Sequence, residues 1–309
     1  MQYNVDGDLV PADEATVSVR DRGFQYGDGA FETMRAYGGD VFAREAHLER
    51  LARTCETLSL DHGIPDETFR RRIDETLAAN DFDDAYVKLS VTRGVQPGTL
   101  TANPDVDPTV VVYVKPLPRG GLGSRPVWDG PAVVQTTKTR KPPANAFPPD
   151  AKTHNYLNSI LARNELVGDA DEALLRDQSG VVAEGAASNL FFVDERGLHT
   201  PSAELALLPG ITRSVVLDLA REEGFPVWDG RYEPSDVREA DEAFLTNTTW
   251  ELRPVATVDG MDVGGGPVTD LLASRFDELV ERRYYDGERL GEGESSNAGT
   301  GAGTPDEPE

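Results

Sequence analysis

Apolar residues recur along the chain with two different spacings, which separate expected strands from expected helices. The first ten residues predict two short strands joined by a turn at Asp6-Gly7-Asp8. Alternation and short apolar runs predict further strands at 85–92, 109–114, 127–136, 172–176, 181–184, 190–193, 198–200 and 243–246. Helical spacing predicts amphipathic helices at 45–60, 64–77, 157–164, 211–223 and 268–285.

Proline and glycine divide this pattern into two parts. The run PLPRGGLGSR (116–125) has almost no large apolar residue, which predicts a linker rather than a phosphate-binding loop. With 309 residues the chain is long enough for two packed domains. We therefore expect an N-terminal domain at 1–118, a linker at 119–125 and a larger C-terminal domain at 126–286. The Gly/Ser/acid-rich tail, 287–309, is expected to be disordered.

The charge balance narrows the choice of partners. The chain carries 55 acidic and 30 basic residues, and its net charge is −25. This excess repels nucleic acids and anionic membranes, so neither is expected as a partner. Only five basic residues are lysines, and the acids are spread over the whole chain. We hypothesise a halophilic protein that is soluble in high salt. The alternative is an ordinary acidic cytosolic protein. If folding and activity were unaffected by the removal of molar salt, the hypothesis would be wrong.

The single cysteine and the distribution of apolar residues indicate the compartment in which the protein is expected. The single cysteine, Cys55, excludes an intrachain disulfide framework and fits a reducing compartment. No stretch approaches the roughly 20 apolar residues of a membrane helix. The polar, acidic start of the chain does not resemble a signal peptide. We expect a cytoplasmic protein without a metal site.

One lysine differs from the other four in its surroundings. Lys152 lies in AKTHNYLN (151–158), directly before an apolar helical stretch and beside polar groups that could hold a ring hydroxyl. A Schiff-base enzyme needs one such amine, held in a pocket with a lowered pKa. By itself the segment favours a surface lysine at a helix start, so its meaning depends on the other motifs.

Three further segments could bind a charged heterocycle. Glu184, in VAEGAASNL (182–190), is a lone acid among apolar and small residues, and a carboxylate beside a pyridine nitrogen keeps that nitrogen protonated. LPGITR (208–213) opens a helix whose first N–H groups favour an anion. TNTTWE (246–251) adds hydroxyls and turn amides after a strand.

A fourth segment, DRGFQYGDGAFETMR (21–35), places an acid between glycines and aromatic residues and ends in an arginine on an expected strand. Aromatic rings with an arginine can line a pocket for an anionic substrate. On the next helix, His47 and Arg50 are three residues apart and so share one face.

These segments together resemble the class IV aminotransferases, which are pyridoxal 5′-phosphate (PLP) enzymes of fold-type IV. The match comprises DRGFQYGDGAFETMR, HLERL, AKTHNYLN, VAEGAASNLF, LPGITR and EAFLTNTTWELRPV, in the family's order and within residues 1–285. The resemblance implies an α+β fold with a small α/β sandwich domain, a larger β-barrel-like domain with helices, and PLP in the cleft between them. It also implies a homodimer that completes the site.

The resemblance assigns roles residue by residue. Lys152 would form the Schiff base and move the substrate's proton, Glu184 would hold the pyridine nitrogen, and Tyr156 would bind near the ring O3′. Asn155 and Tyr156 follow Lys152 by three and four residues, one fewer than is typical of branched-chain transaminases. The phosphate-binding residues would be Arg50, Ile211, Thr212 and Thr248. The substrate side would be lined by Tyr26, Phe31, Arg35, Arg93, Thr249 and Trp250.

Three activities share this scaffold: transamination of branched-chain L-amino acids, transamination of D-amino acids, and elimination of pyruvate from 4-amino-4-deoxychorismate. Thr33, where branched-chain enzymes usually have glycine, favours the lyase, and the short spacing after Lys152 and Thr246-Asn-Thr are typical of lyases or D-specific enzymes. The Arg-x-His pair of D-specific enzymes is absent after Arg93, but Phe31 also matches the branched-chain pocket, as do Tyr26 and Arg35. The lyase is our first expectation, then a branched-chain transaminase, then a D-amino acid transaminase. A protein that only binds its ligand is disfavoured, because Lys152 is retained together with Glu184.

Overall fold

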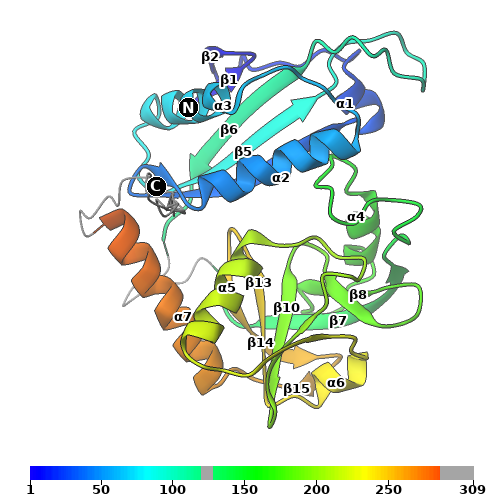
Figure 1. Ribbon diagram of the computed structural model, residues 1–309, viewed down its shortest axis with the longest axis vertical. Coiled ribbons are helices and arrows are strands. Elements are labelled where there is room, and N and C mark those ends of the chain that lie inside the picture. Colours follow the sequence, from blue (N-terminus) through cyan, green and yellow to red (C-terminus); the bar gives the residue numbers. More distant parts are fainter. Residues whose placement is uncertain (120–127, 286–309) are drawn as a thin grey trace, which may run out of the picture.

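The computed structural model describes residues 1–119 and 128–285, and these form two sheets with helices packed against them (Figure 1). The expected linker lies outside the described residues except for Arg119, and the expected tail at 287–309 lies outside them entirely. Within the described ranges, no helix combines the length and apolar composition needed to cross a membrane.

The smaller sheet is antiparallel and has the strand order β2-β1-β6-β5-β3-β4. Two helices, α2 and α3, pack on one of its faces (Figure 1). The elements of this part are β1 (Gln2–Val5), β2 (Asp8–Pro11), α1 (Arg22–Tyr26), β3 (Gly29–Tyr37), β4 (Asp40–Val41), α2 (Arg44–Thr57), α3 (Asp66–Ala78), β5 (Ala85–Thr92) and β6 (Thr109–Pro116).

Strict alternation sorts the two faces of this sheet. In β5, Val87, Leu89 and Val91 are fully buried against the helices, while Tyr86 and Lys88 point to the opposite face. The helices contribute Leu48, Leu51 and Cys55 from α2 and Phe69, Ile73 and Leu77 from α3. The opposite face therefore carries polar and aromatic side chains that are free to serve a site.

The larger sheet has nine strands in the order β12-β11-β10-β13-β14-β7-β8-β9, with β15 paired to β14. It is mixed, because β7 runs parallel to both β14 and β8 and β11 runs parallel to β12. Its elements are β7 (Ala132–Arg140), α4 (Leu157–Arg163), β8 (Glu172–Arg176), β9 (Val182–Gly185), β10 (Asn189–Asp194), β11 (Gly197–Pro201), α5 (Ile211–Glu222), β12 (Val227–Gly230), α6 (Pro234–Arg238), β13 (Glu242–Asn247), β14 (Glu251–Val258), β15 (Met261–Asp262), α7 (Pro267–Val280) and the π-helix η1 (Glu281–Tyr285).

One apolar cluster joins the two parts. Tyr37 and Phe42, from the small part, pack in the same cluster as Phe276 of α7 and the stacked pair Phe191 and Phe244. Helix α7 and η1 therefore fasten the end of the larger part to the smaller one. A mixed α+β fold is as expected from the sequence.

Most elements appear where the pattern placed them, and the exceptions have local causes. Strands β5 and β8 have the predicted bounds, but the expected final helix ends at Val280 and continues as a π-helical turn. Strand β14 was not predicted, because Arg253 and Pro254 interrupt its apolar run. The charged side chain of Arg253 is satisfied by Asp171, a partner 82 residues away.

Candidate functional site

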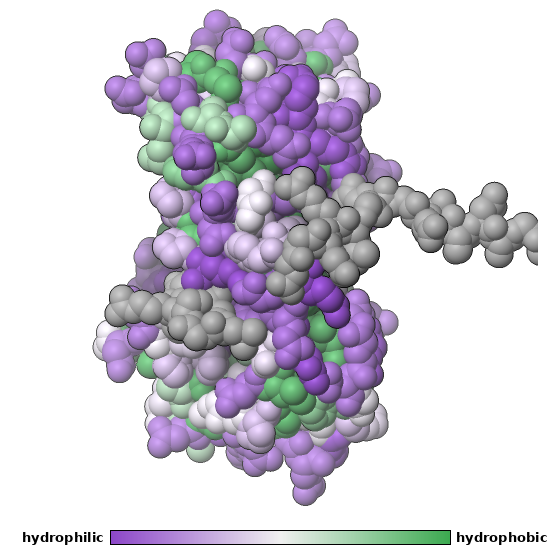
Figure 2. Space-filling model, turned by 90° about the vertical axis from the view of Figure 1, so that its left-hand side faces the viewer, coloured by the Kyte–Doolittle hydropathy of each residue, from purple (hydrophilic) through white to green (hydrophobic). Residues whose placement is uncertain are grey.

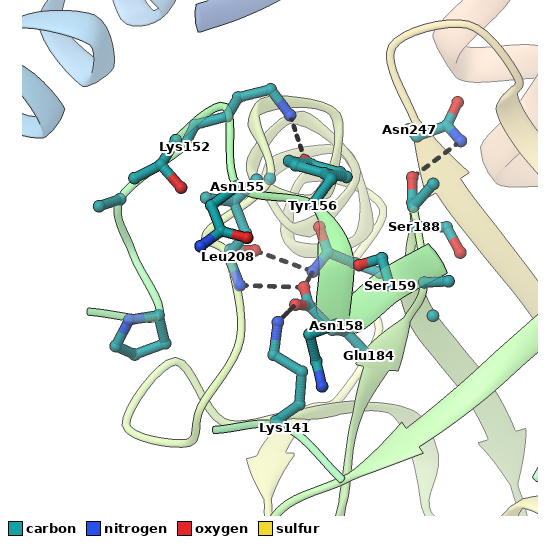
Figure 3. Close-up of a pocket in the computed structure, with 18 of the residues that line it drawn as sticks. Lys141, Lys152, Asn155, Tyr156, Asn158, Ser159, Glu184, Ser188, Leu208 and Asn247 are labelled. Carbon is teal, nitrogen blue, oxygen red and sulfur yellow. Dashed lines mark hydrogen bonds and ion pairs between the residues drawn. The ribbon is translucent and has the colours of Figure 1, made fainter. Parts of the chain in front are cut away.

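A pocket of about 360 Å³ lies between the two parts and takes its walls from both (Figure 3). Helix α2 contributes Arg50, and the walls come from the segment between β7 and α4, the β9–β10 loop, the start of α5 and the β13–β14 turn. Its polar lining residues include Arg50, Lys141, Lys152, Tyr156, Glu184, Ser188, Asn189, Thr212, Thr246, Asn247 and Thr248, and Ile211 also borders it.

Lys152 is held by its backbone, while its amine is left to the pocket. Its N–H donates to Thr54 Oγ1 at 3.1 Å, and its carbonyl accepts the N–H of Phe31 at 3.0 Å. The Nζ atom donates to the Tyr156 hydroxyl at 3.1 Å and lies 4.7 Å from the centre of the Phe31 ring. An amine with such a fixed base and few partners suits a nucleophile.

Glu184 lies at the opposite end of the pocket, in β9 (Figure 3). Its Oε2 accepts the N–H of Leu208 at 2.9 Å and an N–H of Asn189 at 3.4 Å. Its Oε1 accepts from Lys141 Nζ at 2.6 Å. The carboxylate is therefore fixed by three donors, one of them a cation.

The start of α5 forms the third element of the site. Gly210 is the N-cap, and a Cβ atom there would lie only 2.0 Å from Asn189 Oδ1, so the close approach of loop and helix requires glycine. The first N–H groups of the helix, at Ile211 and Thr212, border the pocket. Together with Thr248 from the β13–β14 turn, they form a site suited to a phosphate.

Arg50 approaches this site from α2 and is oriented by Glu32. The guanidinium makes two hydrogen bonds to Glu32, at 2.8 and 2.7 Å, and a third to the Pro209 carbonyl at 3.1 Å. His47 Nδ1 lies 2.8 Å from the same carboxylate. Burial by itself would raise the pKa of Glu32, but hydrogen bonds from Arg50 and His47 outweigh it and lower the pKa to about 2.

A second buried carboxylate lies behind the β9–β10 loop. Glu172 is fully buried in β8, and its Oε1 accepts the N–H groups of Ala173 at 3.1 Å and Ala186 at 2.7 Å. Its nearest cation, Arg163, is 3.4 Å away and largely exposed. Burial therefore raises the pKa of Glu172 to about 7. Glu172 thus holds the backbone of the β9–β10 loop, which directly follows the strand that carries Glu184.

Of the residues expected on the substrate side, some lie near Lys152 and others bind protein groups elsewhere. Phe31 packs edge-on against Tyr156, at 5.3 Å between ring centres, and so borders the lysine. Arg35 is fully buried and bonds to the carbonyls of Thr249 and Pro118 and to Glu251.

The other expected substrate-side residues also bind protein groups outside the pocket lining. Arg93 bonds to Asp28 and to two backbone carbonyls. Trp250 stacks on Arg253, and Tyr26 is half-exposed beside Arg22. The two arginines expected on the substrate side thus join protein segments, because each guanidinium already has protein acceptors.

Sequence reasoning did not identify Glu32, Thr54, Lys141 or Glu172 as part of the site. For Glu32 a signal exists: it shares the core-facing side of β3 with Ala30 and Met34, and a carboxylate there requires a cation. The contact of Lys141 with Glu184 spans 43 residues, and no local pattern marks it.

The residues of the pocket fit PLP. Two buried hydroxyls at its wall, Ser188 Oγ and Thr246 Oγ1, find no hydrogen-bond partner among the described residues. Buried polar atoms normally have partners, so these point to a polar ligand. The helix start and Arg50 would hold the phosphate, Glu184 the ring nitrogen, and Lys152 the aldehyde carbon. No group of His, Cys, Asp and Glu suited to a metal ion occurs in the part of the chain that the structure describes.

Comparisons with known proteins agree with this geometry. Residues 29–258 match the model of the family described as amino-transferase class IV. A putative branched-chain-amino-acid aminotransferase of Methanocaldococcus jannaschii is 37% identical, with 90% of this chain and 96% of the relative covered. A D-alanine aminotransferase of Listeria innocua is 34% identical, with 91% and 97% covered. An aminodeoxychorismate lyase of Bacillus subtilis is 30% identical, with 91% and 96% covered.

Solved structures show the same fold. The branched-chain aminotransferase of Thermoproteus uzoniensis, with norvaline, superposes with a TM-score of 0.83 at 30% identity and covers 92% of this chain and 97% of its own. The PLP form of the branched-chain amino acid aminotransferase of Thermobaculum terrenum gives a TM-score of 0.82 at 28% identity, covering 92% and 95%.

Proposed function

Because the chain belongs to the class IV aminotransferase family, whose members are PLP enzymes acting on small amino compounds, we propose that it is a 4-amino-4-deoxychorismate lyase. The reaction would release pyruvate and leave 4-aminobenzoate. The family assignment is common to several activities, so the choice among them depends on the substrate side of the site.

The observation that supports the lyase is a second ammonium group beside Lys152. Lys88 Nζ lies 4.5 Å from the centre of the Phe31 ring, and Lys152 Nζ lies 4.7 Å from it. Lys88 is half-buried and forms no ion pair among the described residues, and burial lowers the pKa of its amine. Thr33 lies directly opposite Lys88 across the β3–β5 pair.

An ammonium and a hydroxyl at this position match the substrate of the lyase better than an aliphatic side chain. Aminodeoxychorismate carries two carboxylates, one on its ring and one on its enolpyruvyl group, and a half-buried cation stabilises such a group. A branched aliphatic side chain would leave Lys88 desolvated without a partner, which is unfavourable.

Each residue of the site has a task in this reaction. Bound PLP would supply an electron-withdrawing ring. Lys152 Nζ would take the proton from the substrate carbon that bears the amine. The electron pair would then form the last double bond of the aromatic ring as the neighbouring C–O bond breaks, and the released enolpyruvate would take up a proton to give pyruvate. Arg50 and the α5 start would anchor the phosphate, so that Lys152 stays within reach of that carbon.

A branched-chain L-amino acid transaminase is the second candidate. It is favoured by the 37% identity to the Methanocaldococcus relative and by the branched-chain enzymes among the similar structures. A D-amino acid transaminase is the third candidate, and the 34% identity to the D-alanine aminotransferase of Listeria innocua supports it.

The test follows the absorbance of the bound cofactor in high salt, without a keto-acid acceptor. L-leucine, D-alanine and aminodeoxychorismate are added separately. A lyase releases pyruvate from aminodeoxychorismate over many turnovers while the PLP form persists. Stoichiometric conversion to pyridoxamine phosphate by an amino acid would instead identify a transaminase, and the reacting enantiomer would identify which kind.

A homodimer is also part of this proposal. Large apolar side chains are exposed on α1, the 99–100 segment and α4: Phe24 is 72% exposed, Leu100 82% and Leu161 50%. Arg22 donates to the carbonyls of Thr99 and Leu100, which places α1 and the 99–100 segment side by side. The face on the α7 side is predominantly hydrophilic, with apolar residues in scattered groups (Figure 2). Light scattering in high salt would give the mass, and a monomer would contradict the proposal.

A further inference from the structure

The carboxylate expected to hold the cofactor's ring nitrogen already has a cation of its own. Lys141 Nζ lies 2.6 Å from Glu184 Oε1, and the two side chains are only 16% and 9% exposed (Figure 3). The backbone of Lys141 is fixed, since its N–H donates to the Arg176 carbonyl at 2.9 Å and its carbonyl accepts from Gln178 at 2.6 Å. The ion pair is therefore built into the pocket wall.

The ion pair with Lys141 dominates the charge around Glu184. The charged residues that line the pocket are Arg50, Lys141, Lys152 and Glu184. Arg50 is neutralised by Glu32 at the far end, and Lys152 lies beside Phe31 and Tyr156. The remaining donors to Glu184, Leu208 N–H and Asn189, carry no net charge. Lys141 is thus the only lining cation in contact with this carboxylate.

We propose that Lys141 shares the Glu184 carboxylate with the ring nitrogen of PLP and lowers the affinity of that nitrogen for a proton. A carboxylate alone favours a protonated ring nitrogen, because opposite charges attract. With Lys141 in place the pair is already neutral, so a protonated nitrogen would add a net positive charge to a poorly solvated site. The inference rests on the PLP site and not on the choice of substrate.

A cofactor ring that withdraws electrons less strongly suits the lyase reaction. A less protonated ring withdraws less charge from the substrate carbon after its proton has left. The charge kept at that carbon can expel the neighbouring C–O group, whereas a strongly withdrawing ring favours return of the proton to the cofactor. Lys141 would in this way bias the site towards elimination, a consequence that additionally requires the proposed function.

The experiment measures the protonation of the ring nitrogen directly. Holoenzyme is prepared with ¹⁵N-labelled PLP, and the ¹⁵N chemical shift of the ring is followed by NMR against pH without substrate. Lys141→Met removes the charge at nearly constant size, Lys141→Gln is a second uncharged variant in case the first retains cofactor poorly, and Lys141→Arg keeps the charge. Lys138→Met is the matched control, because Lys138 is an exposed residue of the neighbouring strand, β7, outside the pocket lining.

We expect the uncharged variants to raise the proton affinity of the ring nitrogen about tenfold or more, while Lys141→Arg and Lys138→Met stay close to wild type. An unchanged ¹⁵N titration in both uncharged variants would overturn the proposal, and so would an equal shift in Lys138→Met. Because no substrate is present, these outcomes stand whether the protein is a lyase or a transaminase.

Discussion

A buried glutamate lies behind each end of the pocket, but the two are in opposite electrostatic settings. At the phosphate end, Glu32 receives two hydrogen bonds from Arg50 and one contact from His47, and its pKa falls to about 2. Behind the ring end, Glu172 is equally buried but faces backbone N–H groups and the partly exposed Arg163 at 3.4 Å, and its pKa rises to about 7. Equal burial therefore leads to opposite shifts of the pKa.

The difference shows what each end does. A permanently charged Glu32 can orient a permanently charged Arg50, which suits a fixed grip on a dianionic phosphate. Glu172 holds loop amides, and such bonds need no full charge. Glu184 lies between these cases, because it combines neutral donors with one cation, Lys141. The electrostatic environment at the ring end is thus more easily changed than that at the phosphate end.

Replacement of Lys152 has the largest expected effect, because it removes the reacting amine while both ends of the pocket remain. Lys152→Ala should abolish turnover while leaving the fold intact, because its backbone bonds to Thr54 and Phe31 survive. Turnover is measured as pyruvate release or amino transfer, and folding by circular dichroism. Rates near wild type would remove Lys152 from the mechanism.

Removal of the carboxylate at the phosphate end should destabilise the protein most. Glu32→Gln leaves Arg50 buried with an unmatched charge, which costs about 3–5 kcal/mol. Unfolding in urea measures the loss, and Glu49→Gln on the exposed face of α2, the helix that carries Arg50, is the control. A loss no larger than that of the control would mean that Arg50 does not depend on Glu32.

The two glutamates should also respond oppositely to pH. The folded pKa of Glu32 is lowered, so its stabilising contribution is present above about pH 4.5 and lost as pH falls towards 2. The folded pKa of Glu172 is raised, so its contribution is present below about pH 4.5 and lost as pH rises through 7.

Glu172→Gln sharpens this contrast because glutamine does not titrate. The free energy of unfolding of the wild type should include a decline between about pH 4.5 and 7, by about 1.4 kcal/mol for each unit of pKa shift, that the variant lacks. Urea unfolding at both pH values compares them. Parallel pH profiles for the two proteins would show that Glu172 is ionised in the folded state throughout.

The smallest effect is expected at Lys141. If the chain is a lyase, Lys141→Met should raise the fraction of turnovers that end with the cofactor in its pyridoxamine form. That fraction is read from the absorbance lost per pyruvate released, with Lys138→Met as the reference. An unchanged fraction together with a changed ring-nitrogen titration would separate the electrostatic role of Lys141 from its effect on the reaction.

The sequence predicted the helices and strands that form the site better than the contacts between their side chains. The glycine turn of LPGITR predicted an anion site at a helix start, and α5 does begin at Ile211 beside the pocket. The arginines were harder to assign, because a guanidinium in an expected strand gives no indication of its acceptor. Arg35 bonds to Glu251 and to the Thr249 carbonyl, more than 200 residues away.

By itself the sequence determined the family, the α+β class, the cofactor and the strands and helices with strong periodicity, because each depends on motifs or on local patterns of burial. Only the tertiary structure decided how charges are paired: Glu32 with Arg50, Lys141 with Glu184, and Glu172 with the amides of its loop. Electrostatic energies depend on distance and solvent exposure in space, and neither quantity follows from position along the chain.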